Sequence, residues 1–190
     1  ETGLAENTFV LFVSDNGPWL LHEQNGGSAG PLRDGKGSSY EGGQRVPAIA
    51  WWPGKVAPGT DTDHLTAFWD LMPTFAEIAG AEAPEETDGI SMLPTLLSEG
   101  NQAEHEYLYW EFHERGGKQG VRKGKWKAIR LGVQKNRNAP LELYNLEKDP
   151  AEQNNIAAQH PEIVKEMAKI MTDARVDSDL FNFGPTAYKG

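Results

Sequence analysis

Cysteine is absent from this 190-residue chain. The protein therefore has no disulfide bonds, and it has no metal site built from thiolates. The absence leaves the cellular compartment open. Any metal that the chain binds must use oxygen or histidine ligands.

Basic residues are scarce. Eighteen Lys and Arg face 28 Asp and Glu, a formal net charge of −10. We expect no general nucleic-acid partner, because such binding depends on basic residues that meet phosphates. An anionic substrate stays compatible with this charge, because nearby cations can outweigh a distant net charge.

Long apolar runs are also missing, so we expect no membrane-spanning segment and no membrane partner. The chain begins at Glu1 without methionine and shows no signal-peptide pattern. We therefore expect that a leader or a larger upstream portion precedes it.

A short apolar run opens the informative part of the chain. Residues 8–13 are continuously apolar after Thr8 and rich in β-branched and aromatic side chains, which predicts a buried, parallel strand. Asp15 and Asn16 follow it directly. Their oxygens are hard ligands that suit Ca²⁺ or Mg²⁺. Asp-Asn-Gly is also an ordinary turn sequence, so both interpretations stay open from the residues alone.

A glycine-rich segment comes next and carries cations. Glycine allows close approach of the backbone to a ligand, and a cation in such a loop can meet sulfate or phosphate. A simple flexible linker fits poorly, because Leu32, Tyr40 and Val46 interrupt it with anchoring side chains. The glycines are Gly26, Gly27, Gly30, Gly35, Gly37, Gly42 and Gly43.

Several stretches in one order resemble the second half of a formylglycine-dependent sulfatase, of the arylsulfatase-like branch of the alkaline phosphatase superfamily. They are SDNGP at 14–18, GPLRDGKGSSYEGG at 30–43, RVPA at 45–48 and WPGK at 52–55. The resemblance covers nearly the whole chain. It implies an α/β fold class: the C-terminal part of an alkaline-phosphatase-like α/β sheet domain plus a small antiparallel α+β subdomain with a C-terminal helix.

The resemblance also implies roles for single residues. Asp15 and Asn16 match a pair that holds calcium together with acidic residues from the N-terminal half. Lys36 matches the lysine that grips the sulfate group and steadies the leaving oxygen, which makes it the catalytic and substrate-binding candidate. The Cys/Ser-x-Pro-x-Arg motif that yields the formylglycine nucleophile does not occur here.

From that missing motif we expect the full-length protein to be a sulfuric ester hydrolase and this chain alone to be inactive. The implied partners are the N-terminal portion of the same protein and a sulfated small molecule or sulfated glycan. The resemblance implies a periplasmic, lysosomal or secreted location.

Two histidines are candidates for substrate binding only. His22 lies in the glycine-rich segment, and His113 follows the first strand of the predicted small sheet. Trp19 and Trp110 could stack on a sugar or aryl ring, although tryptophan more often packs in a core. Arg33, Glu41 and Arg45 are interpreted as structural. Glu41 would pair with Arg45 or Arg33 to hold the loop, and such an ion pair contributes little to stability at a surface.

The remaining pattern predicts the elements and a division into residues 1–100 and 101–190. We expect a strand at 46–52, a helix at 70–79 capped by Asp70 and ended by Gly80, and a short turn at 92–97. Strands at 107–112, 119–122, 126–130 and 141–146, a helix start at Asp149 and a helix at 161–171 would form the second part. The tail after Asp173 is polar and expected to be loosely held.

Two other functions compete with the sulfatase interpretation. A phosphatase or phosphodiesterase of the same superfamily would need two transition-metal sites with histidine ligands, which the five scattered histidines do not favour. A non-catalytic carbohydrate-binding module would use Tyr107, Tyr109 and Trp110 as its binding face.

Overall fold

A computed structural model describes residues 2–183. Within them the chain forms two compact units. The ribbon unit comprises residues 2–13 and 47–106, and the sheet unit comprises residues 14–46 and 107–183. The glycine-rich segment thus belongs with the C-terminal sheet. A domain boundary near residue 100 stays a prediction.

The ribbon unit contains a two-stranded antiparallel sheet of β1 (Val10–Val13) and β2 (Ala48–Trp51). Val10 pairs with Trp51 and Phe12 with Ile49, so these four side chains share one face. All four are exposed, Phe12 by 71%. The prediction of a buried parallel strand was therefore wrong, because β1 has one antiparallel neighbour and nothing in the described chain covers this face.

Helices of the ribbon unit follow the sequence pattern in position but not in burial. A 3-10 turn, η3 (Phe68–Asp70), leads into α2 (Leu71–Ala79), and α3 spans Leu93–Leu97. Gly80 ends α2 with a φ of 66°, as its position predicted. The predicted apolar stripe is not buried, since Phe75 is exposed and the buried residues of α2 are Pro73 and Thr74. A 3-10 turn, η1 (Ala5–Asn7), precedes β1.

Asp70 ties the ribbon unit together rather than capping α2. Its side chain makes no bond to the first turn of that helix. Instead Oδ2 accepts the Ala67 N–H at 2.7 Å, and Oδ1 accepts the Ile90 N–H at 2.9 Å and lies 2.8 Å from His105 Nε2. The capping prediction was wrong because donors outside α2 take the carboxylate.

The sheet unit is built on a four-stranded antiparallel sheet in the order β3-β4-β5-β6. The strands are β3 (Leu108–Phe112), β4 (Lys118–Lys123), β5 (Trp126–Leu131) and β6 (Leu141–Asn145), and a strand was predicted at each of these four places. The predicted helix α4 (Pro161–Asp173) is confirmed. The predicted helix start at Asp149 is wrong, because residues 149–152 form a turn that precedes η4 (Ala157–Gln159).

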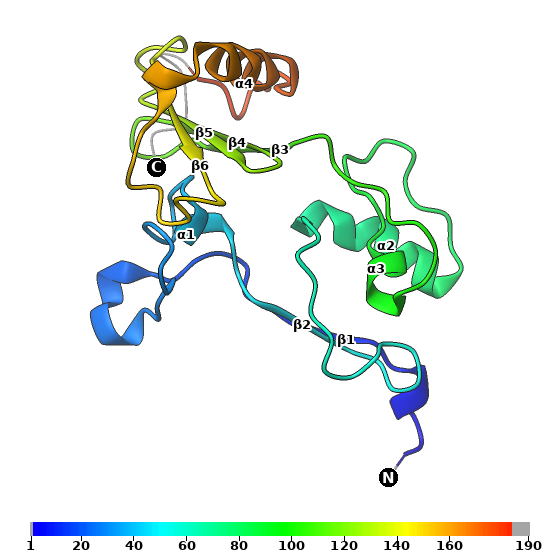
Figure 1. Ribbon diagram of the computed structural model, residues 1–190. Helices are drawn as coiled ribbons and strands as arrows, with labels where there is room; N and C mark the ends of the chain where they lie inside the picture. The colour runs from blue at the N-terminus through cyan, green and yellow to red at the C-terminus, as the bar shows by residue number, and fades with distance from the viewer. Residues whose placement is uncertain (1, 184–190) are drawn as a thin grey trace. The chain divides into compact units, whose positions relative to one another are not determined.

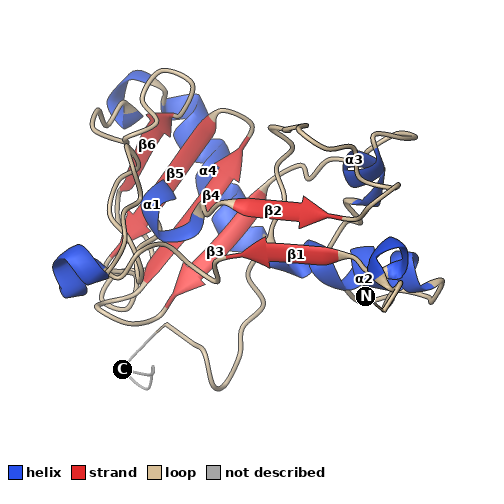
Figure 2. Ribbon diagram, turned by 90° about the horizontal axis from the view of Figure 1, so that it is seen from below, coloured by secondary structure: helices blue, strands red, loops and turns tan. Residues whose placement is uncertain are grey.

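The two faces of this sheet pack against different elements (Figure 1, Figure 2). α4 covers one face, and the glycine-rich segment with the short helix α1 (Glu41–Gln44) covers the other. Val121, Ala128 and Leu143 pack with Met167 and Met171 of α4. Ile129 points to the opposite side, where it packs with Tyr40 and Tyr144. The alternation of strand side chains thus produces two cores on one sheet.

The tail is better held than its composition indicated. Phe183 is buried, and its ring stacks on His113 with centroids 4.4 Å apart. Arg137 donates through Nε and Nη2 to the Phe183 carbonyl. Val176 and Leu180 of the same tail are exposed, and its residues 184–190 lie outside the described residues. Across the described residues, no helix combines the length and apolarity that a membrane span requires.

Candidate functional site

Asp15 and Asn16 occupy a backbone turn fixed against α1. The Gly17 N–H donates to the Gly43 carbonyl at 3.0 Å, and Ser14 Oγ donates to the Asn16 carbonyl at 2.8 Å. A Cβ at Gly17 would lie 1.8 Å from the Gly42 oxygen, so only glycine allows this approach. The pair is thereby held in place although Asp15 itself is exposed.

These two side chains fit part of a calcium site. A carboxylate and a carboxamide are suitable hard ligands, but Ca²⁺ takes six to eight oxygens. No cluster of three or more His, Asp or Glu that could hold a metal occurs in the described part of the chain. Asp15 and Asn16 would therefore need further ligands to complete such a site, and their role as calcium ligands stays a prediction.

Lys36 lies beside the same turn. Its N–H donates to the Pro18 carbonyl at 2.9 Å, so Lys36 is fastened to the residue that follows Gly17. Gly35 makes this approach possible, because a Cβ there would lie 2.3 Å from the same oxygen. The structure thus brings the predicted sulfate clamp next to the predicted metal ligands, within one segment of the sheet unit.

Trp19 and His22 accompany Lys36. Lys36 Nζ lies 5.6 Å from the centroid of the Trp19 ring, within the range of a cation–π contact. The His22 ring meets the Trp19 ring edge to face, with centroids 4.3 Å apart. Three candidates that the sequence placed separately therefore form one cluster, which we call the Lys36 cluster: Trp19, His22 and Lys36.

A buried ion pair anchors the glycine-rich segment to the sheet. Glu41 Oε1 accepts from Lys127 Nζ and Oε2 from Arg122 Nη1, both at 3.0 Å. Lys127 is 0% exposed. Burial disfavours the charge on Glu41, but Lys127 and Arg122 outweigh it and hold the pKa of the carboxyl below its ordinary value. The expected surface pair of Glu41 with Arg45 or Arg33 was wrong, because strand residues provide the partners.

Glu152 supplies a second anchor from the turn after β6. Its Oε2 accepts the Glu41 N–H at 2.7 Å, and its backbone has a φ of 51°, a strained value for this residue. Oε1 is buried and accepts no hydrogen bond within residues 2–183. Burial raises the pKa of the Glu152 carboxyl to about 7, against the opposing effects of the Glu41 N–H and Lys127.

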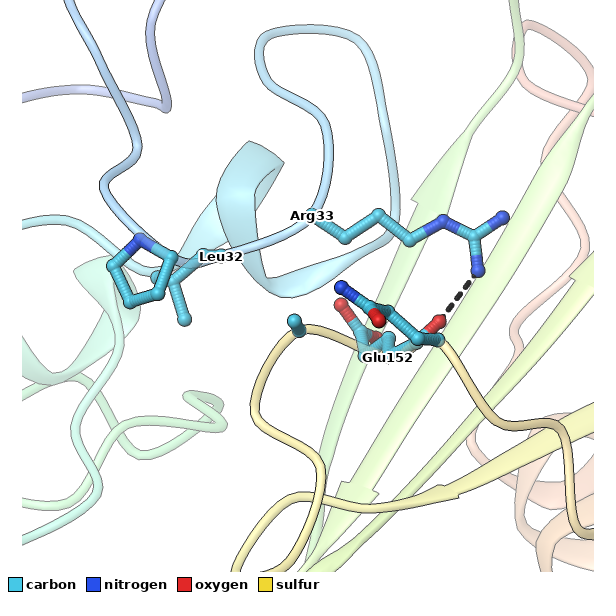
Figure 3. Close-up of a pocket in the computed structure, with 6 residues that line it drawn as sticks. Leu32, Arg33 and Glu152 are labelled. Carbon is cyan, nitrogen blue, oxygen red and sulfur yellow. Dashed lines mark hydrogen bonds between the residues drawn. The ribbon is translucent and has the colours of Figure 1, made fainter.

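Arg33 clamps the segment onto this turn (Figure 3). Its Nη1 donates to the Glu152 carbonyl at 2.7 Å and to Tyr144 Oη at 3.1 Å. The guanidinium lies 3.8 Å from the centroid of the Tyr40 ring. Arg33 is structural, as predicted, through contacts that the sequence did not reveal. A cavity of about 440 Å³ opens here, lined by Pro31, Leu32, Arg33, Ala151, Glu152 and Gln153.

The contacts of His113 are with residues outside the Lys36 cluster. Its Nε2 is 2.9 Å from Glu111 Oε2, and its ring stacks on Phe183 and meets the Phe181 ring edge to face. Nδ1 is buried without a partner in the described chain. A cavity of about 390 Å³ is lined by His113 and its neighbours Glu111, Phe112, Glu114 and Phe181. These contacts describe a packed histidine at the rim of a cavity, and its role with substrate stays a prediction.

The aromatic residues of β3 do not form a common binding face. Trp110 packs over Lys127, whose Nζ is 4.7 Å from its ring. Tyr109 points to the α4 side, where its hydroxyl accepts from Gln119 Nε2 at 2.7 Å. Neighbouring strand residues face opposite ways, so the sheet offers no continuous aromatic surface from these side chains.

Sequence reasoning missed Lys127 and Glu152 as site-supporting residues. Lys127 shares a face of β5 with Ile129, and a lysine buried there needs a carboxylate partner, but the sequence does not show that this face is covered. The signal for Glu152 was masked by the Asp-Pro-x-Glu pattern of a helix start.

Residues 35–177 match the protein family described as N-sulphoglucosamine sulphohydrolase, C-terminal. The chain belongs to this sulfatase family. The match spans both the Lys36 segment and the sheet that supports it. Sulfatase relatives therefore provide the comparison for the site.

Three relatives illustrate the similarity. Human arylsulfatase A is 36% identical over 211 residues, which covers 98% of this chain and 41% of that protein. The structure of Ps i-CgsB in complex with k-i-k-neocarrahexaose has a TM-score of 0.77 and 34% identity, covering 90% of this chain and 37% of the other. The structure of BT4656 in complex with its substrate D-glucosamine-2-N,6-O-disulfate has a TM-score of 0.72 and 26% identity, covering 90% and 35%.

The sulfatase chain described here spans about two fifths of the length of these relatives. Structural matches to sulfatases confirm the expected fold class, part of an alkaline-phosphatase-like α/β domain with a small antiparallel α+β subdomain.

Proposed function

We propose that the full-length protein hydrolyses sulfate esters, and that this chain supplies the sulfate clamp and two calcium ligands. The observation that carries the proposal is the joining of Lys36 to the Asp15–Asn16 turn through the Pro18 carbonyl. A cation and two hard oxygen ligands on one fixed segment suit an anionic ester bound beside a divalent metal.

Lys36 has the central chemical role in this proposal. Its ammonium binds the sulfate in the ground state and stabilises the negative charge that grows on the leaving oxygen. Asp15 and Asn16 provide two oxygen ligands on the side of the site where the metal would bind. When bound, calcium would balance the sulfate charge, and a formylglycine hydrate from the N-terminal portion would supply the nucleophile.

The Glu41–Lys127 pair and Glu152 act as positioning groups. They hold α1 and the segment that carries Lys36 onto the sheet, which fixes the backbone at Lys36 before substrate arrives. Substrate binding by His22 and His113 belongs to the same proposal. We assign residues 1–100 to the larger catalytic domain and 101–190 to the small subdomain.

The N-terminal portion of the same protein is the proposed partner. The face of β1 and β2 with Val10, Phe12, Ile49 and Trp51 is exposed, which is costly for side chains of this size. Because that portion also carries the nucleophile, we propose that the chain alone is inactive.

Release of sulfate from 4-nitrophenyl sulfate by the full-length protein tests the function. The same protein is offered 4-nitrophenyl phosphate and bis(4-nitrophenyl) phosphate in parallel. We expect kcat/KM to be highest for the sulfate ester and the present chain alone to release none. A preference for either phosphate ester would overturn the proposal in favour of a phosphatase or phosphodiesterase.

A further inference from the structure

The Trp19 side chain is a large apolar group without a core role. It is 48% exposed, and it follows Pro18, whose carbonyl holds Lys36. Its neighbours Leu20 and Leu21 are exposed as well. An aromatic ring that stands open beside a cation is a recognised way to bind a ligand with one apolar face and one charged group.

The backbone around Trp19 is fixed rather than loose. The Trp19 N–H donates to the Gly26 carbonyl at 3.0 Å, and the His22 N–H donates to the Trp19 carbonyl at 3.0 Å. A Cβ at Gly26 would lie 2.1 Å from the Trp19 oxygen, so this closure requires glycine. The backbone that carries Trp19 is thus fixed, and its ring centroid and Lys36 Nζ lie 5.6 Å apart.

We propose that Trp19 is the stacking platform for a pyranose ring whose sulfate ester lies on Lys36, which makes a carbohydrate sulfate the substrate class. This rests on the proposed sulfatase function. The short separation suits a single sugar unit that carries the stacking ring and the sulfate ester together.

The surroundings of the ring favour a sugar over an aryl group. His22, Glu23 and Gln24 are exposed polar residues on the same short turn. A pyranose has an apolar C–H face that stacks and hydroxyl groups that hydrogen-bond to such a rim. An aryl group gains most from an enclosed apolar pocket, whereas Trp19 offers one open ring.

The test compares two substrate classes in the full-length protein. Galactose 6-sulfate, N-acetylgalactosamine 6-sulfate and glucosamine 6-sulfate represent sugars, and 4-nitrophenyl sulfate represents aryl esters. For Trp19→Ala we expect kcat/KM on the best sugar sulfate to fall about tenfold, mainly through KM, because stacking of this kind is worth roughly 1 kcal/mol or somewhat more. The value for 4-nitrophenyl sulfate should change less than twofold.

Two further variants make the result specific. Trp19→Phe keeps a ring and should recover most of the sugar activity. Leu21→Ala removes an exposed apolar side chain from the same turn and should leave both substrates unaffected. Unfolding temperatures within about 2 °C of the parent would show that the turn itself is intact.

The outcomes separate this inference from the function on which it rests. If Trp19→Ala lost kcat/KM equally on both substrate classes, or lost none on sugar sulfates, the stacking role of Trp19 would be overturned while the sulfatase function stands. Cleavage of the aryl ester with none of the three sugar sulfates would overturn the substrate class. Release of sulfate from no ester at all would overturn the sulfatase function itself.

Discussion

Glu152 Oε2 accepts the backbone N–H of Glu41 at 2.7 Å, while the side chain of Glu41 binds Lys127. The carboxyl of Glu152 thus holds the main chain of Glu41, and the carboxylate of Glu41 in turn binds Lys127 of the sheet. The two glutamates lie 111 residues apart in the chain. This relationship positions the segment that presents Lys36.

Replacing Lys36 by alanine in the full-length protein should lower kcat for sulfate release by about a hundredfold to a thousandfold. Loss of one preorganised donor at a developing charge has this effect when bond cleavage limits turnover. Lys36→Arg should recover only part of the rate, because a planar guanidinium is not a compact point charge. Steady-state kinetics on the best substrate measure this. Lys55→Ala, at an exposed position, is the control, and equal small losses for Lys36→Ala and Lys55→Ala would remove Lys36 from the site.

Asp15→Ala should weaken calcium binding and reduce turnover strongly in the full-length protein. The substitution removes a charged oxygen ligand, which contributes to both the charge and the geometry of the site. Calorimetric titration of the metal-free protein with Ca²⁺ measures the affinity directly. Asp61→Ala removes an exposed carboxylate elsewhere and should bind calcium like the parent. An unchanged isotherm for Asp15→Ala would place the metal ligands elsewhere.

Lys127→Met should destabilise the protein by about 3–5 kcal/mol, because it leaves the buried Glu41 carboxylate with an incomplete set of partners. Adding Glu41→Gln to that variant should restore part of the loss, since the buried carboxylate is then replaced by a neutral amide and only the part-exposed Arg122 loses its charged partner. Chemical denaturation of the single and double variants gives the coupling free energy. Additive losses would show that the pair does not act as a unit.

Acidification should stabilise the fold through Glu152. Its folded pKa is raised from 4.5 to about 7, so the native state holds a proton that the unfolded state releases above its own pKa. The contribution, about 3 kcal/mol, is fully present below pH 4.5 and is lost as the pH rises to about 7. Glu152→Gln does not titrate, so the difference in unfolding temperature between parent and variant should grow in favour of the parent as the pH falls through this window.

The exposed Glu147 supplies the control for this measurement. Glu147→Gln should follow the parent at every pH. Parallel profiles for the parent and Glu152→Gln would mean that the carboxyl has an ordinary pKa in the folded protein.

Local patterns predicted the elements well. The alternation of Leu141 and Leu143 with polar neighbours gave β6, and Gly80 ended α2 where its position indicated. Lys36, Asp15 and Asn16 came from the resemblance to sulfatases, and the structure places them on one fixed segment. Their chemical roles are the subject of the predictions above.

Long-range partners could not be predicted from the sequence. Lys127 lies 86 residues from Glu41, and nothing local distinguishes it from the exposed Arg45 as a partner. Glu152 follows Asp149 and Pro150 in a pattern that normally starts a helix, but its contacts with Glu41 and Arg33 stabilise a turn with positive φ instead. Tertiary contacts overrode the local preference in both cases.

The opposite orientations of Lys127 and Ala128 on β5 limit how the length of this region can change during evolution. Inserting or deleting one residue within β5 would turn each later side chain to the other face, carrying a lysine into the methionine-lined core and an alanine beneath Glu41. The connection between β5 and β6, at residues 132–140, has no such constraint on its length. Related chains should therefore vary in that connection and keep the number of residues in β5 constant.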